Sequence, residues 1–254
     1  MSSVSAAAPN SHWPYPRFIA HRGGGTLAPE NTLAGFREAR HFCFQGIETD
    51  VMLTADGAAV LSHDPVLGRV VKSASPVASL SLKEIKTLDA GSLTAQKWAG
   101  ERIPTLEEAI ETCEANGLFM NIEIKPASES ATQATAQETV RIVRKLFAGK
   151  SLPLLSSFSR NALAAAAVEA PEIPRGLLLE GIPTDWKEAC KRLSVKTVHP
   201  DWQSVTPDFV EEAHTMGLGI MCYTVDSPDT ADALFTLGVD AVCTNRLDLF
   251  ANCR

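Results

Sequence analysis

The chain of 254 residues carries a formal net charge of −7 and has a pI near 5.4. It contains no run of Lys or Arg, so neither nucleic acid nor an anionic membrane is expected as a stable partner. Hydrophobic residues make up 45% and charged residues 21%, and no segment has the composition of a linker, which favours one globular domain over residues 1–254.

Short apolar runs recur along the chain and alternate with segments of helical periodicity. The strand candidates cover residues 17–20, 46–53, 118–125, 153–158, 176–180, 197–200, 219–225 and 241–244. Helical candidates include 32–44, with Asn31 as candidate N-cap, 106–116, 134–147, 161–170 and 207–216. This alternation predicts an α/β fold, an eightfold (β/α) TIM barrel. A doubly wound sheet would alternate similarly, but its G-x-G-x-x-G turn is absent.

The pattern breaks between His63 and Pro104, where the sequence becomes polar and contains several glycines. This stretch is longer than a normal connection between a strand and a helix. We therefore expect an insertion over about residues 64–104, after the second strand. Because barrel enzymes have their active sites at the carboxyl ends of the strands, this insertion is expected to shape the substrate pocket.

Acidic residues alternate on two of the predicted strands. Glu48 and Asp50 share one face of the second strand, and Asn121, Glu123 and Lys125 share one face of the next. Carboxylates turned inward from a parallel strand would be desolvated and would repel one another unless a cation neutralises them. A strand end at which both acids reach water is the alternative, but the repetition of the pattern favours a metal site.

An all-oxygen set of this kind, without thiolates, suits Mg²⁺ or Ca²⁺ better than Zn²⁺. Glu30 is a possible fourth ligand. The sequence does not distinguish the two ions, because they differ in ligand number and cavity size.

Two histidines follow strand-like runs. His21 and Arg22 precede the glycines at 23–25, which would let the backbone approach a ligand closely, and Arg can clamp phosphate oxygens. His63 precedes Asp64. Either motif alone would more often be a turn with a surface ion pair. In a barrel, however, both histidines reach the face at which the acids converge, where they can act as an acid and base pair.

The chain resembles the glycerophosphodiester phosphodiesterase family, most closely its short cytoplasmic bacterial members. The motifs that carry the resemblance are Trp13-Pro-Tyr-Pro, His21-Arg-Gly-Gly-Gly, Ala28-Pro-Glu-Asn-Thr, Glu48-x-Asp50, His63-Asp64, Leu88-Asp-Ala-Gly-Ser, Ile103-Pro-Thr-Leu, Asn121-Ile-Glu-Ile-Lys-Pro, Leu155-Ser-Ser-Phe, Pro174-Arg-Gly-Leu and Tyr223-Thr-Val. They occur in order over nearly the whole chain.

This resemblance implies an eightfold barrel with a small insertion that hydrolyses glycerophosphodiesters, the deacylated phospholipids, to sn-glycerol 3-phosphate and an alcohol. The residues that it implies for the site are Glu48, Asp50 and Glu123 for a divalent cation, His21 and His63 for proton transfer, Arg22 and Lys125 for the phosphate, and Glu30 as ligand or support. By analogy with related two-histidine barrels, His21 is expected to be the general base and His63 the general acid.

Two positions depart from the family pattern. Tyr223 stands where many relatives carry Trp, which keeps an aromatic wall for the substrate, and Thr244-Asn245 stands where the family usually shows Thr-Asp. Loss of the negative charge at position 245 would weaken a contact that supports the residues of the site. His199 is either a pocket residue or a structural strand end.

Two other classes of protein compete with this interpretation. A binding module that had lost catalysis would lack one of the acids or histidines, and all five are present. A barrel that cleaves phosphoinositides or sphingolipids is the runner-up, but such proteins usually face membranes or lie outside the cell. No apolar run of signal-peptide length occurs, and the six cysteines form no C-x-x-C pair, so we expect a cytoplasmic protein with reduced cysteines, mostly in the core.

Overall fold

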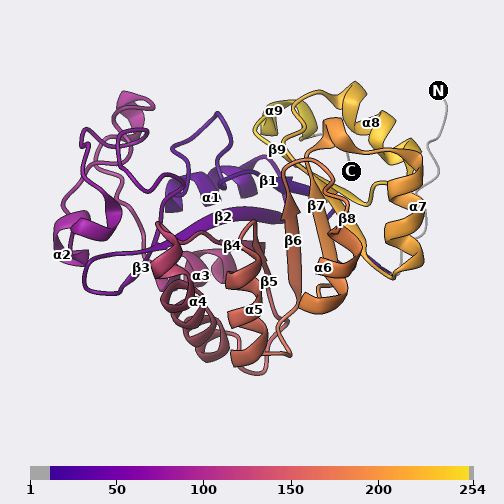
Figure 1. Ribbon diagram of the computed structural model, residues 1–254. Coiled ribbons are helices and arrows are strands. Elements are labelled where there is room, and N and C mark those ends of the chain that lie inside the picture. The colour runs from indigo at the N-terminus through magenta and orange to yellow at the C-terminus, as the bar shows by residue number, and fades with distance from the viewer. Residues whose placement is uncertain (1–11, 252–254) are drawn as a thin grey trace.

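The computed structural model describes residues 12–251, and within them eight parallel strands close into a barrel (Figure 1). They are β1 (Phe18–Ala20), β2 (Gly46–Leu53), β4 (Phe119–Ile124), β5 (Leu154–Ser157), β6 (Arg175–Leu179), β7 (Thr197–Pro200), β8 (Gly219–Cys222) and β9 (Ala241–Thr244). The barrel closes because β1 pairs with both β2 and β9. The predicted eightfold barrel is confirmed, and the expected strand ends are displaced by no more than three residues.

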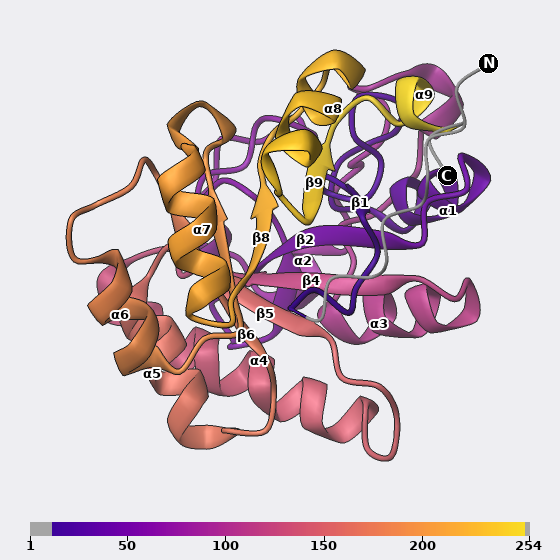
Figure 2. The same cartoon turned by 90° about the vertical axis from the view of Figure 1, so that its right-hand side faces the viewer.

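Helices follow the strands and pack around the outside of the barrel (Figure 2). They are α1 (Leu33–His41), α3 (Leu106–Ala115), α4 (Thr132–Leu146), α5 (Arg160–Glu169), α6 (Trp186–Leu193), α7 (Pro207–Thr215), α8 (Pro228–Leu237) and α9 (Leu247–Phe250), with short 3₁₀ turns η3 (Glu129–Ala131) and η4 (Trp202–Ser204). Local sequence explains their starts. In α3, for example, Thr105 and Glu108 each accept from the other's backbone N–H, a capping box that satisfies otherwise unpaired donors.

Two local expectations are wrong. The structure has an additional strand, β3 (Ala59–Leu61), antiparallel to β2, and three residues are too few to show a period in the sequence. Helix α1 is capped by Thr32, whose Oγ1 accepts from the backbone N–H of Gly35 at 3.2 Å. Asn31 does not cap this helix, since its φ of 54° is left-handed whereas an N-cap is extended.

The segment between β3 and α3 forms the expected insertion and projects to one side of the barrel (Figure 1). It contains η1 (Val77–Ser79), α2 (Leu82–Ile85) and η2 (Gln96–Trp98). Its buried side chains form a separate apolar cluster with two residues of the adjoining strands: Met52, Val60, Leu67, Val71, Val77, Ile85, Ala90 and Ile103. The insertion therefore has a small core of its own, which gives it a defined shape beside the open end of the barrel.

The amino ends of the strands are filled by apolar side chains. Ile19, Leu154, Met221, Ala241 and Cys243, which come from four different strands, pack together with Trp13 from the segment before β1. Trp13 is 5% exposed and donates through Nε1 to the carbonyl of Pro16 at 3.0 Å. These side chains close this end of the barrel.

Most of the described cysteines are buried, as expected: Cys113, Cys190, Cys222 and Cys243. Cys43 is exposed, so the expectation of a core position is wrong there, because it follows the end of α1 at the surface. Cys253 and residues 1–11, which include most of the N-terminal segment expected to lack a signal peptide, lie outside the described residues. Among residues 12–251, no helix is both long and apolar enough to cross a membrane.

Candidate active site

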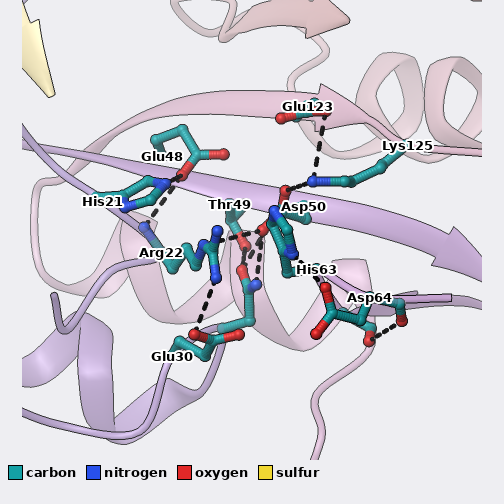
Figure 3. Close-up of polar contacts among 12 residues, drawn as sticks. His21, Arg22, Glu30, Glu48, Thr49, Asp50, His63, Asp64, Glu123 and Lys125 are labelled. Carbon is teal, nitrogen blue, oxygen red and sulfur yellow. Dashed lines mark hydrogen bonds and ion pairs between the residues drawn. The ribbon is translucent and has the colours of Figure 1, made fainter. Parts of the chain in front are cut away.

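Three buried carboxylates meet inside the barrel. Glu48 and Asp50 are two residues apart on β2, so strand alternation turns both to the interior. Glu123 on β4 lies directly beside Asp50 in the parallel register. One oxygen from each lies within 4.8 Å of the others, and each residue is less than 10% exposed (Figure 3). The structure therefore brings together the three acids that the sequence predicted as metal ligands.

Burial and repulsion disfavour ionisation of two of the three carboxyl groups, those of Glu48 and Glu123. Burial, followed by the charges of Asp50 and Glu123, raises the pKa of Glu48 well above its ordinary value. Burial and Asp50 also raise the pKa of Glu123 to about 8. For Asp50, burial again favours a higher pKa, but nearby cations, Lys125 foremost, hold the pKa below its ordinary value. A bound cation would relieve the repulsion, and three carboxylate donors fit a hard divalent ion.

Two basic side chains border the cluster. Lys125, at the end of β4, holds Nζ 3.2 Å from Oδ1 of Asp50. Arg22 donates through Nη1 to Oε2 of Glu30 at 3.0 Å, and its backbone N–H donates to Oε2 of Glu48 at 3.0 Å. Glu30 is thus engaged by Arg22 and lies outside the group of three acids, a position that favours support over ligation.

An amide fixes the orientation of His21. Its Nδ1 lies 2.7 Å from Oδ1 of Asn245, whose amide nitrogen donates to Asp226 at 3.0 Å. The second bond turns the amide oxygen toward the ring, so Nδ1 carries the proton and Nε2 is left basic. Burial, then the charge of Arg22, lowers the pKa of His21 to about 4. The ring is therefore neutral near pH 7, with Nε2 3.9 Å from Oε2 of Glu48.

The ring of His63, which follows β3, has a carboxylate as its hydrogen-bond partner. The ring Nδ1 donates to Oδ1 of Asp64 at 2.6 Å. Burial would raise the pKa of Asp64, but hydrogen bonds from His63 and Arg69 outweigh it and hold that pKa below its ordinary value. Burial lowers the pKa of His63 itself, despite the opposing charge of Asp50 and the bond to Asp64. The two histidines therefore have different partners, a neutral amide for His21 and a carboxylate for His63.

Asn31 is a functional candidate that the sequence reading placed wrongly at a helix cap. Its amide donates to Oδ2 of Asp50 at 2.8 Å and accepts at Oδ1 from Oγ1 of Thr49 at 2.6 Å and from the backbone N–H of Asp50 at 3.1 Å. It therefore orients the central carboxylate of the cluster. Its position next to Glu30 was the available signal, whereas its left-handed backbone could not be read from the sequence.

The glycines after Arg22 are tightly packed against other parts of the protein, while their expected approach to a ligand stays a prediction. A Cβ at Gly23 would lie 2.2 Å from a ring carbon of Phe36 in α1, and one at Gly25 would lie 2.2 Å from the carbonyl oxygen of Asn245. Glycine at both positions is therefore required by close contacts within the protein. These contacts allow the turn that aims the backbone N–H of Arg22 at the acidic cluster.

Two residues beyond the cluster have distinct positions. Tyr223 follows β8, donates its hydroxyl to the carbonyl of Leu179 at 2.9 Å, and meets the ring of Phe158 edge-on at 5.7 Å. Its role toward a substrate stays a prediction. His199 is completely buried and its Nε2 lies 2.9 Å from Oγ1 of Thr197, so it is a structural residue of the barrel interior.

Comparison with known proteins agrees with this geometry. The sequence model of the glycerophosphoryl diester phosphodiesterase family matches residues 21–249. A glycerophosphodiester phosphodiesterase of Caldanaerobacter subterraneus is 34% identical over 235 residues, which cover 92% of this chain and 96% of the relative. Two solved structures are similar over nearly their full length. One is an Oleispira antarctica phosphodiesterase in complex with the product sn-glycerol-3-phosphate, with a TM-score of 0.89, 34% identity and coverage of 92% of this chain and 95% of that one.

The other is a glycerophosphodiester phosphodiesterase of Agrobacterium tumefaciens, with a TM-score of 0.79, 28% identity and coverage of 93% of this chain and 99% of that one. The family match covers most of the chain, and the relatives align over nearly their whole length. The eightfold barrel, the buried acids and these similarities lead to the same conclusion: the chain belongs to the glycerophosphodiester phosphodiesterase family.

Proposed function

We propose that this protein hydrolyses glycerophosphodiesters to sn-glycerol 3-phosphate and an alcohol in a reaction that depends on a divalent cation. The observation that carries the proposal is the buried group of Glu48, Asp50 and Glu123, with two histidines beside it that have unlike partners. The similar Oleispira antarctica phosphodiesterase, solved with sn-glycerol-3-phosphate, supports the choice of product.

The three carboxylates would hold Mg²⁺ or Ca²⁺. Such an ion supplies charge that stabilises a phosphate oxygen and lowers the pKa of a nearby hydroxyl. Arg22 and Lys125, which border the cluster, would bind the remaining phosphate oxygens, with Glu30 holding the guanidinium in place. This arrangement concentrates positive charge at one point of an otherwise acidic protein.

The tautomer of His21 suits it to act as the general base. Its Nε2 would remove the proton from the glycerol hydroxyl next to the ester, whose oxygen then attacks phosphorus while the bond to the departing alcohol breaks. His63, protonated more readily once an anionic diester lies beside it, would give its proton to the departing alkoxide. Water would open the resulting cyclic phosphate with the two roles exchanged.

A cavity of about 290 Å³ borders the acidic cluster on one side. Glu123, Lys125, Glu129 and Phe158 are among the residues that line it. This space lies next to the proposed phosphate position, so it offers room for one of the two alcohol groups of the diester. Phe158 is 43% exposed and, with Tyr223, forms an aromatic boundary on this side.

The proposal is tested by incubating the protein with glycerophosphocholine or glycerophosphoethanolamine and a divalent cation, and by following glycerol 3-phosphate with a coupled dehydrogenase. We expect stoichiometric glycerol 3-phosphate and free alcohol. Release of phosphocholine instead would show that the other ester bond is cleaved. A deoxy analogue without the neighbouring glycerol hydroxyl should be inert, and its cleavage at a comparable rate would show that water attacks directly.

A further inference from the structure

One arginine of the insertion contacts two of the ion pairs that surround the acidic cluster. Arg69 donates through Nε and Nη2 to the two oxygens of Asp64, at 2.8 and 2.9 Å. One of these oxygens, Oδ1, also accepts from Nδ1 of His63 at 2.6 Å. A bidentate guanidinium fixes the plane of the carboxylate as well as its position. The orientation of the His63 ring therefore depends on Arg69 through a single intermediate residue.

The same guanidinium also reaches the other side of the site. Its Nε lies 3.4 Å from Oε1 of Glu30, whose second oxygen accepts from Nη1 of Arg22 at 3.0 Å. Glu30 and Arg22 are only 18% and 14% exposed, so this pair is largely withdrawn from solvent. Arg69 thus connects the histidine expected to be the general acid with the arginine expected to bind phosphate, along one continuous chain of charged contacts.

The backbone on both sides of Arg69 is anchored. Leu67 and Val71 are 6% and 1% exposed and belong to the apolar cluster of the insertion, and the backbone N–H of Leu67 donates to the carbonyl of Ser75 at 3.0 Å. The side chain of Arg69 itself is 48% exposed. Exposed ion pairs contribute little to folding stability, so this convergence of contacts is better explained by what it does to the site.

We propose that Arg69 is a positioning residue through which the insertion holds both the His63–Asp64 pair and the Glu30–Arg22 pair in their working orientations. This inference rests on the proposed function. It implies two separable effects of losing the guanidinium. Poorer alignment of His63 impairs protonation of the departing alkoxide, which matters only for a poor leaving group. Poorer placement of Arg22 weakens substrate binding for any leaving group.

The test compares two substrates, glycerophosphocholine and a glycerophospho-nitrophenyl diester, whose phenolate departs without a proton. Arg69→Ala should lower kcat for glycerophosphocholine by about 10- to 100-fold, leave kcat for the nitrophenyl diester much less affected, and raise KM for both. Arg69→Lys keeps the charge without the bidentate fork and should show the same selectivity at smaller amplitude. Arg141→Ala is the matched control, because it removes an equally bidentate pair with Glu138 on the surface of α4.

A double variant tests whether the effect of Arg69 on His63 passes through Asp64. If Arg69 acts on His63 through Asp64, then in an Asp64→Asn background Arg69→Ala should produce no further change in the ratio of the two kcat values. Thermal unfolding of each variant checks that it is folded. If Arg69→Ala is not folded, the same comparison of the two substrates is made with Arg69→Lys.

The outcomes separate the two hypotheses. If the native enzyme cleaves glycerophosphocholine but Arg69→Ala slows both substrates equally, or neither, the inference about Arg69 is wrong and the proposed function stands. An additive effect of Arg69→Ala and Asp64→Asn on the ratio would also overturn it. If the native enzyme cleaves neither diester, the proposed function fails and the inference fails with it.

Discussion

At the scale of single residues, His21 and His63 are distinguished by the groups that are hydrogen-bonded to Nδ1 of their rings. Asn245 is a neutral acceptor and leaves Nε2 of His21 unprotonated, whereas the Asp64 carboxylate can stabilise a protonated His63. The amide at position 245, where the family usually has an acid, therefore does not remove the contact to His21. It keeps the contact through a neutral acceptor, which fixes the tautomer in which Nε2 of His21 is free to accept a proton.

This difference predicts a leaving-group effect for His63. His63→Ala should nearly abolish cleavage of glycerophosphocholine but spare most activity on the nitrophenyl diester, since acid catalysis of about 10²- to 10⁴-fold is needed only for the alkoxide. His21→Ala should impair both substrates. Steady-state kcat values for the two diesters provide the measurement. If the better leaving group rescues the His21 variant instead, the two roles are reversed.

A second prediction concerns Glu123. Glu123→Gln keeps the shape of the side chain but removes a carboxyl group whose ionised form is disfavoured by burial and by the charge of Asp50 when no cation is bound. Cation affinity should fall by at least about tenfold, while the cation-free protein becomes more stable. Calorimetric cation titration and denaturant unfolding in chelator measure these opposite changes. Glu107→Gln, on the first turn of α3, is the surface control. An unchanged cation titration would exclude Glu123 as a ligand.

At the scale of elements, the insertion depends on its own apolar cluster. Ile85 in α2 is completely buried there, so Ile85→Ala should lower the free energy of unfolding by about 2–5 kcal/mol. Because the same cluster anchors the backbone around Arg69, activity on glycerophosphocholine should fall as well. Urea unfolding and kinetics test both effects, with Val168→Ala at an 83% exposed position of α5 as control. A loss of stability below about 0.5 kcal/mol would contradict the packing described here.

The elements also show what the sequence could reveal. The period of two on β2 and β4 was enough to group Glu48, Asp50 and Glu123 correctly, since strand geometry alone turns them to one face. Side chains in loops do not alternate between two faces in this way, so their positions cannot be predicted from spacing alone. The contribution of Asn31 depends on a left-handed backbone, and that of Arg69 on how the insertion packs, and both are set by tertiary contacts. Strand β3 was missed for the same reason, since its pairing with β2 defines it.

At the scale of the whole molecule, the buried His199 predicts how stability changes with pH. Burial lowers its pKa to about 3 from an ordinary value of 6.5. Between these values the unfolded chain binds a proton that the folded protein does not, so stability is fully present above pH 6.5 and decreases as the pH falls, by about 1.4 kcal/mol per unit. His21 acts in the same direction.

A His199→Gln variant should therefore lose less stability than the native protein between pH 7 and pH 5. Denaturant unfolding at the two pH values, with the surface variant His41→Gln as control, measures the difference. An equal loss in the native protein and in His199→Gln would show that this histidine does not stay neutral in the fold.

At the scale of the whole molecule, the proposed function requires a cation that balances the buried carboxylates, and the most direct test is turnover as a function of free divalent cation. The protein is treated exhaustively with a chelator, the chelator is removed, and glycerol 3-phosphate release from glycerophosphocholine is measured as Mg²⁺ or Ca²⁺ is added back. We predict negligible turnover without cation and saturable recovery with it. Full turnover in the cation-free protein would contradict metal-dependent catalysis at Glu48, Asp50 and Glu123.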